Sequence, residues 1–203
     1  MFLIYLAFPP SLVVFWGYSV LMYLCTMKRY TKIPDLLRPL AEAPVQAKFT
    51  SALQVADVLE WILEQVGPAE VWQTSFSISE EFLRRLYFIQ KKHTVHAFHL
   101  VLDLKATNKT ISLWSFIRQV MQDTALAANH SKLLLVKADS GTVVSVITSQ
   151  NLTRGNRQEG YLITTDKGVF AEYHADLMEF MQYHSIPFKD IYEEMLHPAP
   201  SEE

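Results

Sequence analysis

The stretch NHSKLLLVK (residues 129–137) places a histidine and a lysine two positions apart, directly before a run of apolar residues. In an extended segment alternate side chains share a face, so His130 and Lys132 point one way while Ser131 points the other. Both side chains can then reach one small anion. Taken alone, the pattern also fits a loop histidine followed by a solvated lysine, so its meaning depends on the rest of the chain.

A second polar pattern, ITSQNLTRGNRQE (residues 147–159), follows at the end of the next predicted strand. Ser149 and Asn151 are again two apart and share a face. If the two strands are neighbours, Lys132 supplies positive charge to a phosphate, and Ser149 and Asn151 donate hydrogen bonds to it. His130 supplies a nucleophile or proton carrier. Glu159, at the start of the following predicted strand, can accept a hydrogen bond from the second ring nitrogen of His130.

HSKLLLVK, TSQNLTRGNRQE and their spacing resemble the phospholipase D-like phosphodiesterases, whose signature is H-x-K-x-x-x-x-D followed by G-S/T-x-N. The resemblance implies that His130 attacks phosphorus and forms a phosphohistidine. It also implies that Lys132 and Asn151 hold phosphate oxygens, that Ser149 assists, and that Glu159 orients His130. No metal and no other cofactor is implied.

Two features depart from this signature. Lys137 occupies the aspartate position, with Asp139 two residues later, and Thr148 replaces the glycine. The chain also has a single H-x-K motif, whereas sites of this family are built from two. The resemblance therefore implies a homodimer in which a two-fold axis brings two copies of His130 together.

The hydrophobic periodicity predicts an α/β fold: a three-layer α/β/α sandwich with a mixed, mostly parallel sheet, as in one half of a phospholipase D-like protein. Helices are expected over 51–66, capped by Ser51, and over 80–92, capped by Ser79, with further helices over 112–123 and 170–184. Strands are expected over 69–77, 95–104, 131–137, 142–149 and 160–166, the third and fourth forming a hairpin. The expected domain spans 47–185, with a connector over 28–46 and a short helix and tail over 186–203.

The amino terminus differs in composition from the rest, because residues 1–27 carry no charged side chain. Pro9 and Pro10 interrupt it and leave 11–27 as the unbroken apolar part, at the short end of what a spanning helix needs. Basic residues follow on the carboxyl side only, which places the rest of the chain in the cytoplasm: Lys28, Arg29 and Lys32. The segment is either a membrane anchor or a mis-assigned start upstream of Met27.

Charge and composition limit the kinds of ligand and site that the chain can have. The net charge of -3 provides no global basic field, so any contact with nucleic acid must be local. The single cysteine excludes an internal disulfide and a cysteine-based zinc site. His93, His96 and His99 do not match common metal-ligand spacings, because along a strand the middle histidine faces away from the other two.

We expect a nuclease-like hydrolase acting on nucleic acid, because Arg154 and Arg157 flank the predicted phosphate pocket as substrate-binding residues. Lipid headgroups are the second substrate class, favoured by membrane contact through residues 1–27. A non-catalytic module that binds phosphate or DNA ends is the rival, supported by Lys137 and the missing glycine. A membrane-tethered structural protein is a third reading.

Overall fold

The sheet and helices are known from a computed structural model, which describes residues 33–196. The apolar segment 1–27 and the tail beyond residue 196 lie outside the described residues. Among residues 33–196, no helix combines the length and the apolar character needed to cross a membrane.

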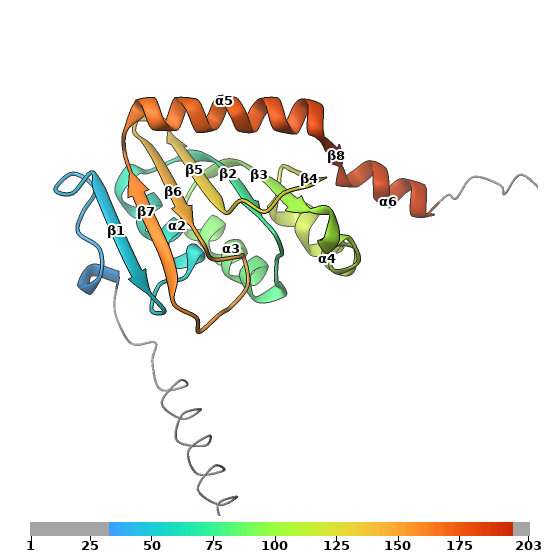
Figure 1. The fold of residues 1–203 in the computed structure, drawn as a ribbon, viewed down its shortest axis with the longest axis horizontal. Coiled ribbons are helices and arrows are strands. Elements are labelled where there is room, and N and C mark those ends of the chain that lie inside the picture. The colour runs from blue at the N-terminus through green and yellow to red at the C-terminus, as the bar shows by residue number, and fades with distance from the viewer. Residues whose placement is uncertain (1–32, 197–203) are drawn as a thin grey trace, which may run out of the picture. The chain divides into compact units, whose positions relative to one another are not determined.

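An eight-stranded sheet forms the middle layer, in the order β1-β7-β6-β5-β2-β3-β4-β8 (Figure 1). The strands are β1 (Val45–Thr50), β2 (Ala69–Ser75), β3 (Val95–Asp103), β4 (Asp123–Ala127), β5 (Leu133–Ala138), β6 (Val143–Thr148), β7 (Glu159–Thr164) and β8 (Ser185–Pro187). The helices are α2 (Val55–Val66), α3 (Glu80–Lys92), α4 (Thr107–Val120), α5 (Lys167–His184) and α6 (Phe188–Leu196), with short 3-10 helices η1 (Ile33–Asp35) and η2 (Leu104–Ala106).

The three-layer α/β fold and the mixed sheet are confirmed, but the expected predominance of parallel pairing is wrong. Only β2–β3 and β3–β4 are parallel. The other neighbours in the sheet are antiparallel. The strand–helix alternation that gives these parallel pairs spans residues 55–127. From β5 to β7 the strands follow one another without a helix, and Gly141, with φ of 79°, closes the β5–β6 hairpin.

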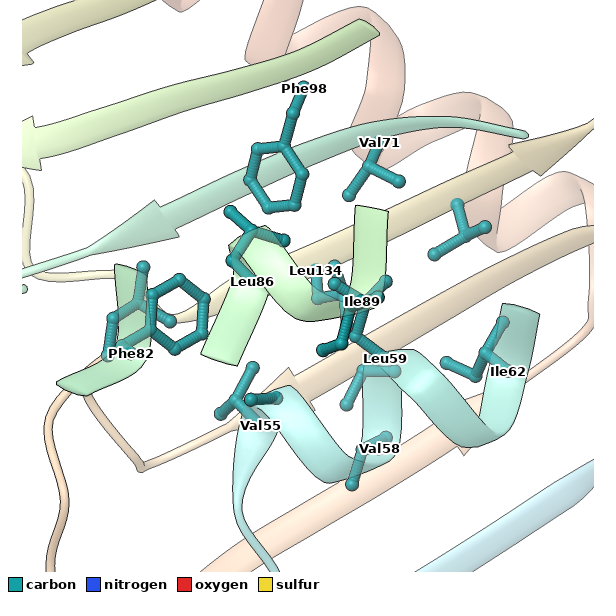
Figure 2. Packing of buried hydrophobic residues seen from close by; sticks show 14 of the residues in the cluster. Val55, Val58, Leu59, Ile62, Val71, Phe82, Leu86, Ile89, Phe98 and Leu134 are labelled. Atoms are coloured by element: carbon teal, nitrogen blue, oxygen red, sulfur yellow. The ribbon is translucent and has the colours of Figure 1, made fainter. Parts of the chain in front are cut away.

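Alternate residues of β5 serve the two faces of the sheet. Leu134 and Val136 belong to the larger core, which β5 shares with α2, α3 and α4. Leu133 and Leu135 belong to a smaller core that α5 completes on the opposite face with Phe170. Figure 2 shows the larger core, in which Leu134 lies beside side chains of α2 and α3. Burial on both faces fixes the register of β5, and with it the position of His130 just before it.

The segment before β1 also packs on the body. Leu37 and Leu40, within the predicted connector, are almost fully buried. On β1, by contrast, Val45 and Phe49 are exposed, at 60% and 78%. The connector region therefore contributes to the core, while β1 forms one edge of the sheet.

Helix α3 begins with the expected cap. The Ser79 hydroxyl accepts a hydrogen bond from the Phe82 amide at 3.3 Å and donates one to the Leu152 carbonyl at 3.2 Å. Helix α2, however, begins at Val55 after Gln54, so the predicted cap at Ser51 is wrong. The Val55 amide instead donates to the side-chain oxygen of Gln150 at 2.9 Å, a partner far along the chain.

Ser79→Ala is expected to lower the free energy of unfolding by about 1 kcal/mol, the usual cost of losing a helix cap. Urea unfolding followed by circular dichroism measures the change. The exposed residue Ser112, whose hydroxyl bonds the Lys109 carbonyl within its own helix, provides the control. An equal effect of Ser112→Ala would contradict the capping role of Ser79.

Candidate active site

The loop between β4 and β5 holds His130 through its two neighbours. The Asn129 side-chain oxygen accepts hydrogen bonds from the amide and the hydroxyl of Ser131, at 3.0 and 2.6 Å. The Asn129 amide nitrogen donates to the buried Asp103 carboxylate at 3.0 Å, and its side-chain nitrogen to the Ser75 carbonyl at 3.2 Å. The flanking residues are therefore fixed, and the exposed His130 side chain projects from a constrained turn.

Lys132 lies against His130, as the sequence pattern suggested. Its ammonium donates to the His130 carbonyl oxygen at 2.6 Å and lies 3.3 Å from the ring Nδ1. Burial lowers the pKa of Lys132, and the Glu159 and Asp103 carboxylates oppose that change. The imidazole and the cation thus share one small region, which suits an anionic group.

Ser149 and Glu159 form a pair of their own. The Ser149 hydroxyl donates to Oε2 of Glu159 and accepts from the Gly160 amide at 3.0 Å. Across residues 33–196 the hydrogen bonds of Glu159 do not include one to His130, whose ring contacts Lys132 instead. In this arrangement Glu159 orients the serine hydroxyl, and its predicted action on His130 stays a prediction.

Asn151 is held by its oxygen. Oδ1 accepts from the Ser75 hydroxyl at 3.3 Å and from the Phe76 amide at 3.2 Å. The amide nitrogen is therefore the end that can donate to a phosphate oxygen. The Phe76 ring meets the His130 ring in an edge contact, with centroids 5.5 Å apart and planes at 62°. Phe76 thus links the two predicted site residues.

A cavity of about 830 Å³ lies next to these groups. His130, Lys132 and Ser149 line it, whereas Asn151 and Glu159 do not. Its remaining walls come from the ends of β2, β5 and β6, from the loop before β5 and from α5. The volume is in the range of small-molecule and substrate pockets.

The two predicted substrate-binding arginines lie elsewhere. Arg154 donates to the Glu81 carboxylate on α3 at 2.8 Å, and both side chains are mostly exposed. Arg157 is exposed, and neither arginine lines the cavity. Any contribution of these arginines to substrate binding therefore comes from the surface outside the cavity.

Sequence reasoning missed the residues that support His130. Asp103 ends β3 beside β4, and Asn129 follows β4, so both lie where parallel neighbours end at one edge of the sheet. That edge is where ligands bind in open α/β sheets, and a polar residue ending each predicted strand was the available signal. Phe76 gave no such signal, because an aromatic residue after a strand is ordinary core composition.

Three other histidines, His93, His96 and His99, lie beside acidic side chains. Nε2 of His96 lies 2.9 Å from Asp139, and the His99 ring lies between Asp123 at 2.8 Å and Glu70 at 3.0 Å. His93 has ring nitrogen within 4.8 Å of carboxylate oxygens of Glu60 and Glu64. The Lys92 ammonium bonds both of these carboxylates, at 3.0 and 2.8 Å, and offsets part of their charge.

The His99 environment predicts a pH dependence of stability. The hydrogen bond to Asp123 raises the pKa of His99 above its usual 6.5, with burial opposing and Glu70 adding to the rise. The stabilisation is therefore complete below pH 6.5 and is lost as pH rises through the higher pKa of the folded state. Burial and Lys137 lower the pKa of the nearby His174, so that residue acts in the opposite direction.

Replacing His99 isolates its share of the effect. The difference in unfolding free energy between the wild type and His99→Gln is expected to be larger at about pH 5.5 than at about pH 8.5. Urea titrations at both values measure it, and Asp123→Asn should reproduce the trend. A difference that grows with pH would contradict the assignment.

Comparison with known proteins identifies the architecture. No protein-family model and no curated protein matches the sequence. Among solved structures, Nuc from Salmonella typhimurium, described as a phospholipase D family member, is similar at a TM-score of 0.50 and 14% identity over 70% of this chain and 96% of that chain. The fold is phospholipase D-like.

Two further structures share this phospholipase D-like fold at low sequence identity. NucT from Helicobacter pylori matches at a TM-score of 0.50 and 11% identity, covering 70% of this chain and 99% of that chain. The archaeal chromatin protein TrmBL2, described as binding DNA in a novel mode, matches at 0.50 and 11% identity, covering 86% and 68%. These likenesses establish the fold, and the activity must be argued from the site.

Proposed function

We propose that the protein is a phosphodiesterase that hydrolyses P–O bonds through a phosphohistidine on His130. The observation that carries the proposal is the contact of Lys132 with His130 beside Phe76, whose backbone amide holds the Asn151 side chain, on a phospholipase D-like fold. An accessible imidazole beside a cation and an amide donor is suited to attack at a phosphate.

The proposed reaction has two steps. A ring nitrogen of His130 attacks phosphorus and the bond to the leaving oxygen breaks, while Lys132 and Asn151 bind the non-bridging oxygens. Water then attacks the phosphohistidine, the P–N bond breaks, and a phosphomonoester leaves. Each step needs a second group, which first protonates the leaving oxygen and then accepts a proton from the water.

A second copy of the chain supplies that group in the proposal. The His130 side chain is exposed and can meet its counterpart across a two-fold axis. The protein is thus proposed to act as a homodimer, with one imidazole attacking and the other transferring protons.

Nucleic acid is the proposed substrate class. The similarity to a DNA-binding chromatin protein supports it, as do the exposed Arg154 and Arg157 on the segment that carries Asn151. A module that binds phosphodiesters without turnover is the second candidate, because Glu159 bonds to Ser149 and leaves His130 without a carboxylate partner in the described chain.

The test measures phosphodiester hydrolysis, the covalent intermediate on His130 and the mass of the protein in solution. The full chain is incubated with bis(p-nitrophenyl) phosphate and with labelled DNA in the presence of EDTA, and its mass in solution is measured on the same sample. We expect a dimer that hydrolyses phosphodiesters and carries an acid-labile phosphate on His130 when quenched during turnover. A monomer that is inactive on both substrates would refute the phosphodiesterase and favour the module that binds phosphodiesters without turnover.

A further inference from the structure

The cavity beside His130 has two unlike ends. One end carries His130, Lys132 and Ser149. The other is formed by α5, where Tyr173 and Phe180 are seven residues apart and thus lie on one side of the helix. A phosphate bound at the first end would place its substituent against these aromatic side chains.

The charges in the cavity exclude a second phosphate from that far end. Of the residues that line the cavity, all of them described, only Lys132 carries an ammonium group. It lies at the His130 end. Asp176 on α5 lines the far end and would repel a neighbouring backbone phosphate. The far end therefore suits an uncharged group.

The far end is also not purely apolar. Asp176 lies on α5 between the two aromatic side chains, and Thr148, at the end of β6, also lines the cavity. An acyl chain would remove these polar groups from water without giving them hydrogen bonds, which is unfavourable. A nucleobase presents aromatic faces for stacking and polar edges for hydrogen bonds, and it satisfies both kinds of lining.

We propose that this cavity binds an unpaired nucleobase adjacent to the scissile phosphate, which makes single-stranded nucleic acid the substrate. The inference rests on the proposed function, because it takes the His130 end as the phosphate site. A base within a duplex is stacked on both sides and paired along its edge, so it cannot enter without unpairing.

Binding measured without turnover tests the inference. The full chain carrying His130→Ala is titrated against a fluorescent single-stranded oligonucleotide, the same sequence as a duplex, and a strand in which every base is replaced by an abasic site. We expect the single strand to bind at least about 10-fold more tightly than either competitor, since stacking of even one or two bases supplies that ratio.

Substitutions on α5 test whether the base binds against Tyr173 and Phe180. In the same background Tyr173→Ala and Phe180→Ala should each weaken single-strand binding by roughly 5- to 100-fold, the range found for a lost stacking partner. Tyr173→Phe, which keeps the ring, should retain affinity. Tyr183→Ala is the matched control, because Tyr183 is an α5 aromatic residue that is 67% exposed and does not line the cavity.

The outcomes separate the inference from the proposed function. Equal binding of duplex and single strand, or no effect of Tyr173→Ala with the protein still folded, overturns the inference. Binding to anionic phospholipid vesicles in place of oligonucleotides also overturns it and assigns the cavity to an acyl chain. The wild type could instead bind the single strand in a Tyr173-dependent way and hydrolyse neither substrate. That result would support the base site and refute the proposed phosphodiesterase activity.

Discussion

His130→Ala is expected to lower phosphodiester turnover by on the order of 10³-fold or more, because a covalent pathway cannot proceed without its nucleophile. The loss should appear in kcat on bis(p-nitrophenyl) phosphate and on DNA alike. The exposed position of His130 means that the variant keeps its fold, which a thermal unfolding curve checks.

The matched control is His96→Ala. His96 is also exposed, bonds Asp139, and lies at the start of β3 outside the cavity lining. Its replacement should leave kcat within about twofold of the wild type, as for surface changes far from a site. Equal losses in the two variants would mean that the measured turnover comes from a contaminant or from a different site.

Phe98→Ala is expected to destabilise the domain by about 3–5 kcal/mol, the cost of emptying an aromatic position in a packed core. Phe98 lies on β3, is 1% exposed, and faces the core side chains of α3 (Figure 2). The loss is a large share of the roughly 5–15 kcal/mol that stabilises an ordinary domain.

Urea unfolding of Phe98→Ala and Phe88→Ala measures the effect against a matched control. Phe88 lies on α3 and is 66% exposed, so its removal should change the unfolding free energy by less than about 0.5 kcal/mol. Similar midpoints for the two variants would place Phe98 outside the cooperative core.

Local patterns in the sequence predicted local structure well. The Ser79 cap of α3 and the β5–β6 hairpin at Gly141 both depend on neighbours within a few residues. The same is true of the His130–Lys132 contact, which follows from the period of an extended segment. Such features need no knowledge of the rest of the chain.

Features that depend on distant partners could not be predicted in this way. The cap of α2 comes from Gln150, and the ion pair of Arg154 comes from Glu81 on α3. The direction of strand pairing is another case, because it depends on which strands become neighbours after the chain has folded. Asp103 reaches the site for the same reason, since only the β3–β4 pairing brings it to Asn129.

Helix α5 is attached more loosely than the other walls of the site. Of its residues from Lys167 to His184, only Phe170 and Leu177 are buried. The free energy needed to detach an element falls with the apolar contacts that hold it, so α5 should open without unfolding the sheet. Its amide hydrogens should therefore exchange with solvent sooner than those of β5, and each such opening widens the space that a substrate must enter.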